Sequence, residues 1–357
     1  MFFGNNQRKK ARMRFKTHLL VFVMLLSCAV SHAQYNIHWT LFDMSPLSLN
    51  PAKTGAYEGT FRVGGIYRDQ DNFIGGAKGY RTPLIFADAP LIWMRKKKDW
   101  IGVGGMYYSD KSGSLGLGQT FGAFSAAYHY TVNKQSYLSL GFQIGSGGRS
   151  VDLTGKEIFT TDFNTTTQSA SAVDRTAFNT DKKANFVDRT IGLAYTTKID
   201  KKTKLNVGIA FAHLGKVKYG INKTGTQALL PLMTTVHAEV TRQITKKIGF
   251  APQLMYRTTA KAQELNIQAI GTYDMKPDDA KSPILRGGLG YRVFGNDLQI
   301  LLGADLKNNW RIAASYDIET SGLRNAKTAN GFELGVWYTA KIYKKPTVKT
   351  VIYCPRY

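Results

Sequence analysis

The histidines are the residues of this sequence with the clearest potential for chemistry, because histidine is the usual general base of a hydrolase. Two of the six lie in the first 33 residues, and the other four are His38, His129, His213 and His237. None of the four falls in a Gly-x-Ser-x-Gly or His-x-x-x-His motif, so no nucleophile or metal partner stands at a useful spacing. We therefore expect structural histidines and a protein that is not an enzyme.

Metal and cofactor sites have no better support. Asp278 and Asp279 lack the glycine and the terminal glutamate of a calcium loop. Gly145, Gly147 and Gly148 follow an expected strand but lead into a polar loop instead of a helix, which excludes a dinucleotide site. The sequence predicts no cofactor and no metal ion.

Residues 1–33 have the parts of a secretory signal peptide. They contain no acidic residue, and a basic stretch precedes an apolar run over residues 19–30 that is too short to cross a bilayer as a helix. Small residues at Ser31 and Ala33 predict cleavage after Ala33. A lipoprotein signal ending at Cys28 is the alternative. In either case Cys354 lies alone near the other end of the chain, and no internal disulfide is expected in the exported protein.

Alternating hydropathy recurs along the rest of the chain. Apolar residues occupy every second position in 138–144, 205–211, 310–318 and 332–338, with mostly small or polar residues between them. Such alternation is typical of strands with one lipid-facing and one lumen-facing side. A soluble β-sandwich could contain any one of these segments. Their repetition, together with 35 Gly, 19 Tyr and 19 Phe, predicts an all-β fold, a transmembrane antiparallel β-barrel.

The pattern predicts about fourteen strands, with short periplasmic turns and longer extracellular loops. We expect an N-terminal periplasmic or plug segment over 34–58, the barrel over 59–340 and a basic periplasmic tail over 341–357. The expected strands begin near Thr60, Leu84, Trp100, Gln119, Tyr137, Asp188, Lys204, Met233, Ile248, Glu264, Leu285, Leu298, Trp310 and Gly331. The longest loop is expected between Arg149 and Val187.

The excess of positive charge is expected mainly at the periplasmic end of this barrel. The chain has 48 basic and 24 acidic residues, a net charge of +24, and much of the excess falls in the expected periplasmic turns and tail. Clustered lysines favour docking onto an acidic periplasmic protein or lipid head groups, although solvated turns are also often lysine-rich. No nucleic-acid motif accompanies them. The candidate partner-binding residues are Arg95, Lys96, Lys97, Lys98, Lys201, Lys202, Lys246, Lys247, Lys341, Lys344, Lys345, Lys349 and Arg356.

Charged residues inside the strands should point into the lumen, because a charge facing lipid is costly. The residues concerned are Arg62, Arg68, Arg286, Arg292, Asp88, Glu239, Asp305 and Asp317. Glycine pairs at 64–65, 104–105 and 287–288 would permit kinks or the close approach of an internal plug. The leading segment with Pro46 and Pro51 is the candidate for that plug, or for a periplasmic latch.

Several short motifs give the chain a resemblance to a known family. In order they are MSPLSLNPAKTG at 44–55, YRDQ at 67–70, YSDKSG at 108–113, GYR at 290–292, SYDIETSGL at 315–323, GFEL at 331–334 and CPRY at 354–357. In this order the chain resembles the PorP/SprF family of type IX secretion system outer-membrane proteins. Lys53, where the family often has an aromatic residue, and the long loop depart from that pattern.

The resemblance implies an integral outer-membrane protein that works with the periplasmic ring of the secretion machinery. Some family members serve gliding motility by presenting large secreted adhesins. We expect a non-enzymatic scaffold that anchors the ring, an adhesin, or both to the outer membrane. The alternative is a passive porin or a hydrophobic-substrate transporter, which an open, conducting lumen would favour. A filled lumen would favour the scaffold.

Overall fold

The computed structural model describes residues 37–70, 80–93, 99–112, 117–150, 163–164, 169–170, 183–219, 228–260, 262–277, 279, 282–306, 309–320 and 330–342. The expected signal peptide with its cleavage after Ala33, Asp278, most of the long loop, and the tail beyond residue 342 lie outside these ranges. No helix in the described residues has the length and apolarity needed to span a membrane.

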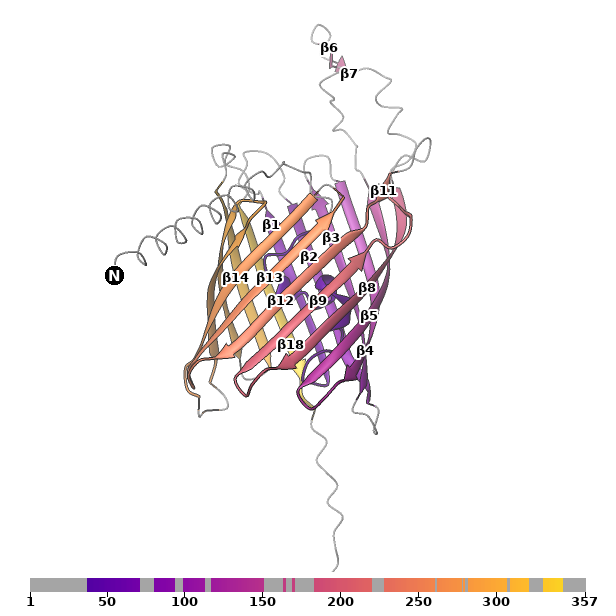
Figure 1. Ribbon diagram of the computed structural model, residues 1–357. Helices are drawn as coiled ribbons and strands as arrows, with labels where there is room; N and C mark the ends of the chain where they lie inside the picture. The colour runs from indigo at the N-terminus through magenta and orange to yellow at the C-terminus, as the bar shows by residue number, and fades with distance from the viewer. Residues whose placement is uncertain are drawn as a thin grey trace, which may run out of the picture.

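Fourteen antiparallel strands form a closed barrel, as the sequence predicts (Figure 1). The last strand pairs with the first over ten residues and closes the sheet. The strands of the barrel are β1 (Phe61–Gln70), β2 (Tyr80–Trp93), β3 (Trp100–Ser112), β4 (Leu117–Thr131), β5 (Ser136–Ser150), β8 (Lys183–Lys198), β9 (Thr203–Ala212), β12 (Met233–Gln243), β13 (Ile248–Thr259), β14 (Ala262–Asp274), β15 (Ile284–Arg292), β16 (Asp297–Leu306), β17 (Trp310–Glu319) and β18 (Gly331–Ala340). Two small hairpins pair β6 (Phe163–Asn164) with β7 (Ser169–Ala170) and β10 (Val217–Lys218) with β11 (Leu229–Leu230).

Alternation decides which side of each strand faces the lumen. In β5, Leu138, Leu140 and Phe142 are exposed on the outer surface, whereas Ser139 and Gln143 are buried inside. A sheet with apolar side chains on its outer face is stable where lipid covers that face, and closure leaves no unpaired strand edge. The alternation expected from the sequence is therefore confirmed.

All but two strands begin within two residues of the expected positions. The exceptions are β2, which begins at Tyr80 instead of Leu84, and β8, which begins at Lys183 instead of Asp188. With Ser150 also in β5, the long loop is shorter at both ends than expected. β2 accommodates two prolines, and its ladder with β3 is irregular between Pro90 and Ile92, where a missing N–H costs little.

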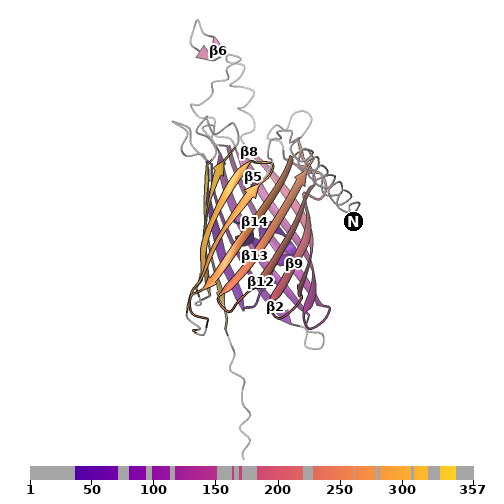
Figure 2. The same ribbon diagram turned by 60° about the vertical axis from the view of Figure 1, so that its left-hand side comes forward.

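The barrel has two distinct ends. The proximal rim is the end where β1 begins and β18 finishes, and it has the short connections 132–135, 199–202 and 244–247. The distal rim is the opposite end, to which β5 and β8 extend before the long loop. In Figures 1 and 2 the proximal rim lies below and the distal rim above.

The plug, residues 37–55, lies inside the barrel (Figure 1, indigo). It consists of short helical turns: η1 (Phe42–Met44), α2 (Pro46–Leu49) and η2 (Pro51–Lys53). Proline at the first position suits two of these turns because it has no N–H to leave unpaired, and the Asn50 side chain caps η2 by accepting from the Ala52 N–H at 2.9 Å. Trp39, Leu41, Met44 and Leu47 are almost fully buried and form part of the core against the inner wall.

Candidate functional site

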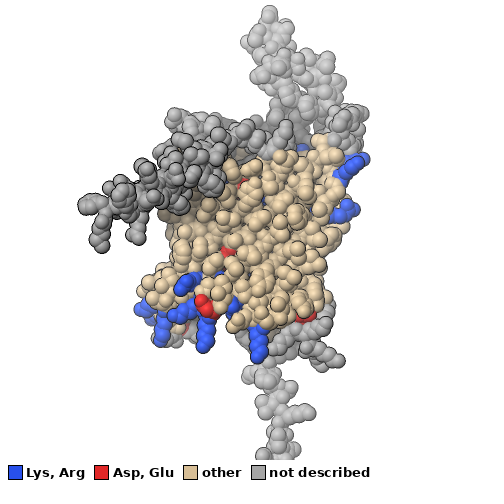
Figure 3. Space-filling model, viewed as in Figure 1, with Lys and Arg blue, Asp and Glu red and all other residues tan. Residues whose placement is uncertain are grey.

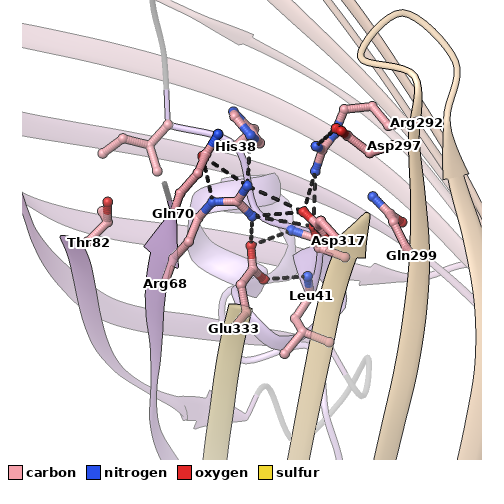
Figure 4. Close-up of polar contacts among 12 residues, drawn as sticks. His38, Leu41, Arg68, Gln70, Thr82, Arg292, Asp297, Gln299, Asp317 and Glu333 are labelled. Atoms are coloured by element: carbon pink, nitrogen blue, oxygen red, sulfur yellow. Dashed lines mark hydrogen bonds and ion pairs between the residues drawn. The ribbon is translucent and has the colours of Figure 1, made fainter. Parts of the chain in front are cut away.

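The distal end of the plug is held by a carboxylate of the last strand. Glu333 is fully buried and points inward, because its neighbours Phe332 and Leu334 in β18 face outward. Its two oxygens accept from the backbone N–H groups of Thr40 and Leu41, each at 2.8 Å (Figure 4). A charged acceptor on two main-chain donors forms strong hydrogen bonds, so β18 fixes the backbone direction of the plug at this point.

Arginines of two further strands neutralise this carboxylate and its neighbour. Arg68 of β1 pairs with Glu333 and lies 3.3 Å from Asp317 of β17, which Arg292 of β15 approaches to 3.4 Å (Figure 4). The Thr40 hydroxyl donates to Asp317 at 2.7 Å. Buried charges are tolerated only when they are paired and hydrogen-bonded, and these groups satisfy both conditions.

His38 ends this cluster on the distal side. Its Nε2 lies 3.0 Å from an Arg68 nitrogen, which can only donate, so Nε2 accepts and must be unprotonated. Burial lowers the pKa of His38 well below its ordinary value of 6.5, and the charges of Arg68, Arg292 and Arg257 lower it further. A cavity of about 120 Å³ lies beside it.

The middle of the plug is held by close backbone contact. The Asn50 side chain donates to the carbonyls of Leu193 in β8 and Ile209 in β9, at 3.1 and 3.2 Å. Asn50 reaches these carbonyls because the facing residues, Gly192 and Gly208, have no side chain: a Cβ on Gly192 would lie 2.0 Å from the Asn50 side chain. The amide also contacts His237 Nε2 at 3.2 Å.

Two more glycines allow the same approach from neighbouring strands. A Cβ on Gly141 of β5 would lie 2.2 Å from the Ala52 nitrogen, and one on Gly102 of β3 would lie 2.1 Å from the Thr54 carbonyl oxygen. In both cases the obstacle is backbone, which cannot rotate away as a side chain can. The inner wall is therefore shaped to the plug here.

The proximal end of the plug is fixed by β2, β3 and β4. His129 in β4 contacts the Thr54 carbonyl through Nε2 at 2.8 Å and the Ser139 hydroxyl through Nδ1 at 2.7 Å. The Gly55 N–H donates to Asp88 at 2.8 Å, and the Trp100 indole donates to the Gly55 carbonyl at 3.0 Å. His129 and Ser139 resemble a base and nucleophile pair, but both are completely buried and His129 is bonded on both nitrogens, so no substrate can reach them.

The expected lumen-facing charges do point inward and pair there. The pairs are Arg62 with Asp88 at 2.8 Å, Arg68 and Arg292 with Asp317, and Arg286 with Asp305 at 3.4 Å, while Glu239 lies 4.0 Å from Lys53 of the plug. Sequence reasoning missed the central role of Glu333 and the four inner glycines. The alternation of β18 was the available signal for Glu333, since it places an acidic residue between two lipid-facing ones.

Lys201, Lys202, Lys246, Lys247 and Lys341 are exposed at the proximal rim, where Figure 3 shows basic side chains along the lower edge. The turn with Lys201 and Lys202 lies next to the turn with Lys246 and Lys247, because β9 pairs with β12 and the Gln243 N–H donates to the Lys202 carbonyl at 2.9 Å. Lys341 follows β18, six strands from β12 along the barrel. The remaining candidates lie outside the described residues: Arg95, Lys96, Lys97, Lys98, Lys344, Lys345, Lys349 and Arg356.

The described residues offer no alternative chemical centre. Among them, no group of three or more His, Cys, Asp or Glu side chains is arranged to hold a metal ion. All four described histidines have structural partners, including His213, which lies 2.8 Å from Asp188. Beside Leu49, a lumen cavity lined by Tyr108, Phe121 and Phe186 measures about 60 Å³, room for only a few water molecules. The arrangement therefore immobilises a segment inside a barrel.

Comparisons with known proteins agree with this architecture. The toluene transporter TbuX of Ralstonia pickettii is 12% identical, with a TM-score of 0.51 over 84% of this chain and 94% of that one. The toluene transporter TodX of Pseudomonas putida is 13% identical, with a TM-score of 0.49 over 88% and 95%. At such identity the likeness to TbuX shows the fold alone. No curated protein matches the chain in sequence. The family model described as type IX secretion system membrane protein PorP/SprF matches residues 31–338, so the chain belongs to that family.

Proposed function

We propose that this protein is a closed, non-enzymatic scaffold of the type IX secretion machinery that anchors the periplasmic ring, a secreted adhesin, or both to the outer membrane. The observation that carries the proposal is the filled lumen. Glu333, Asn50 and Asp88 take part in three separate sets of hydrogen bonds that hold the plug along the length of the barrel. A transport pore needs a path for its solute, whereas an anchor needs only a stable wall and exposed ends.

The proximal rim is the proposed contact with the ring. An even number of strands places both ends of the barrel chain on one side, which is the periplasm in bacterial barrels of this type. Lys201, Lys202, Lys246 and Lys247 would then form a basic patch facing the ring. Exposed lysines accelerate encounters with an acidic surface, and salt weakens that attraction.

The alternative is a passive porin or a transporter of hydrophobic substrates. TbuX is described as a toluene transporter, and the lumen cavity beside Leu49 is lined partly by aromatic side chains. Its volume of about 60 Å³ is too small for a hydrocarbon substrate unless side chains move. The scaffold is therefore the better-supported function.

A pull-down from outer membranes in mild detergent tests the scaffold. The test variant replaces Lys201, Lys202, Lys246 and Lys247 with Gln, and the control replaces the distal-rim residues Lys183, Lys216 and Lys218. We expect ring proteins to be lost from the test variant and kept by the control, with wild-type recovery falling as salt rises. A third variant, with Gln at 95–98 and 344–345, extends the test to the remaining basic clusters.

The identity of the captured proteins separates the possible roles. Ring proteins would support a role in secretion, and one very large secreted protein would support adhesin anchoring. Equal capture by all variants in low and high salt would contradict electrostatic docking. If the purified barrel carried no partner and conducted ions in a planar bilayer, the porin would replace the scaffold as the proposed function.

A further inference from the structure

A groove of about 840 Å³ crosses the outer face of the barrel over β1 to β5 and reaches β8. Its floor is low because outward-facing positions are occupied by Gly105, Gly122 and Gly148. Ile85 and Phe124 stand beside it, and Phe124 is 79% exposed. The side chains of these strands leave the groove open toward the membrane.

The residues that line the groove change from apolar at one end to polar at the other. Over β1 and β2 it is lined by Val63 and Ile85, whereas over β4, β5 and β8 it is lined by Thr120, Ser146 and Asn185. The same change runs along the strands themselves, since the outward residues of β5 are apolar up to Ile144 and then become Ser146, Gly148 and Ser150. The polar end therefore lies where the lipid-facing surface stops, toward the distal rim.

Basic side chains lie on one side of this polar end, on β8 and in the segment beside it. Lys183 and Arg189 are exposed on the outer face of β8, and Lys216 and Lys218 are exposed in the segment beside it. A Cβ on Gly215 would lie 3.8 Å from the Arg189 guanidinium, which places that segment next to Arg189. The only acidic residue of β4, β5 and β8 is Asp188, which points inward to His213. The outer face of β8 is thus cationic from the edge of the apolar surface, where Arg189 pairs with Ile144, to the distal rim at Lys183.

We propose that this groove binds a phosphorylated glycolipid of the outer leaflet, of the lipid A class, with an acyl chain along the apolar end and a phosphate on the basic side chains. The proposal rests on the orientation given above, in which the distal rim faces out of the cell. A cation facing outward on a barrel strand is tolerated at the interface and is costly at the midplane, so Arg189 is suited to a head group. Polybasic surfaces attract anionic lipids for the same reason.

Filling the groove is the first test. In Gly122→Leu the new Cβ would meet nothing closer than Tyr107 at 3.6 Å, so the side chain can occupy the groove without disturbing the barrel. The matched control is Gly287→Leu in β15, where nothing lies within 4 Å of the new Cβ and the strand is seven positions from β4 around the barrel. Both variants add the same apolar side chain to a lipid-facing glycine.

Reversing the charge is the second test. Arg189→Glu with Lys216→Glu removes the proposed phosphate contacts, and Lys201→Glu with Lys202→Glu makes the same change at the proximal rim. Each purified barrel is checked for folding by its heat-dependent gel mobility, and co-purified lipid A per barrel is measured by mass spectrometry. We expect a loss of at least about tenfold with both test variants and no change with either control.

Adding single lipids to wild-type protein from which bound lipid has been removed identifies which class of phosphorylated lipid the groove binds. Bisphosphorylated lipid A should raise the thermal unfolding midpoint, and dephosphorylated lipid A or phosphatidylglycerol should raise it much less. Undiminished lipid A in Gly122→Leu, an equal loss in the controls, or an equal response to phosphatidylglycerol would overturn the proposal. Ring capture by Gly122→Leu should match the wild type, so failure here is separable from failure of the scaffold.

Discussion

The two halves of the plug are held by different physical means. The distal half, around Thr40 and Leu41, is bonded to ionised side chains of β17 and β18. The half from Asn50 to Gly55 lies mainly against strand backbone, because glycines such as Gly141 and Gly192 leave room for it, and a carboxylate, Asp88, holds it only at Gly55. The first half thus depends on charge balance in a buried cluster, and the second depends mainly on the shape of the inner surface of the barrel.

This difference determines what each half tolerates. A buried ion network is damaged by any change that leaves one charge without its partner, even if the size of the side chain is unchanged. A close backbone contact does not depend on side-chain charge, but a single added carbon atom disrupts it. Three experiments follow from this distinction.

The largest effect is expected from Glu333→Gln. The amide oxygen can replace one acceptor, but the amide nitrogen would face an N–H of Thr40 or Leu41, or the Arg68 guanidinium, and Arg68 would lose its closest counter-charge. Breaking a buried pair in this way costs about 3–5 kcal/mol. Thermal unfolding in detergent should show a lower midpoint, and planar-bilayer recordings should show new conductance.

Glu239→Gln is the control for that change. Glu239 also faces the lumen, but its side chain is 36% exposed and lies 4.0 Å from Lys53, so its loss should cost below about 1 kcal/mol. Equal effects of the two substitutions would show that the plug does not depend on the Glu333 cluster.

A smaller effect is expected from Gly141→Ala. The added Cβ would lie 2.2 Å from the Ala52 nitrogen, and the plug or β5 would have to move, which costs about 1–3 kcal/mol. The readout is protease cleavage within residues 50–55, which should rise in the variant. Gly271→Ala, where the nearest atom lies 3.6 Å away, is the matched control and should behave as the wild type. An unchanged cleavage rate in Gly141→Ala would contradict close backbone packing.

The smallest effect is expected from pH. The pKa of His38 is lowered in the seated plug, so a released plug binds a proton more readily once the pH falls below the ordinary value of 6.5. The free energy that holds the plug inside the barrel should therefore fall on acidification below that value, by at most about 1.4 kcal/mol per pH unit. Protease access to residues 37–41 should rise as the pH falls. His38→Gln should flatten the response, because its oxygen accepts from Arg68 without titrating, and an unaltered pH dependence would exclude His38 as its source.

The sequence predicts the barrel well because lipid imposes the alternation. Fourteen strands and nearly all their starting points follow from the exposed apolar positions. The errors, at β2 and β8, occur toward the distal rim, where outward residues such as Ser146 and Asn185 are small or polar and the alternation disappears. Strand pairing continues there through backbone hydrogen bonds, which hydropathy does not report.

The site is less predictable than the wall. The arginines and aspartates in strands could be expected to face inward, since lipid excludes them. Which of them would meet the plug depends on the register of strands far apart in sequence. Glycine contacts are harder still: of the glycine pairs noted in the sequence, Gly104 meets Leu47 of the plug, whereas Gly287 faces open space on the outside. Gly141 and Gly192 are single glycines, not pairs, that allow the plug to approach, and glycine has no distinctive pattern in their strands.

The bond between Thr40 and Glu333 joins residues 293 positions apart. The plug precedes the first strand, whereas the carboxylate that holds it belongs to the last, and the arginine that neutralises that carboxylate lies on the first. Closure of the barrel and attachment of the distal end of the plug therefore depend on the same strand, β18. During assembly the distal end of the plug lacks its bonds to Glu333 until β18 has formed, whereas Asn50 and Gly55 bond to earlier strands. A chain that stops before residue 333 lacks both the pairing of β18 with β1 and the hydrogen bonds to Thr40 and Leu41.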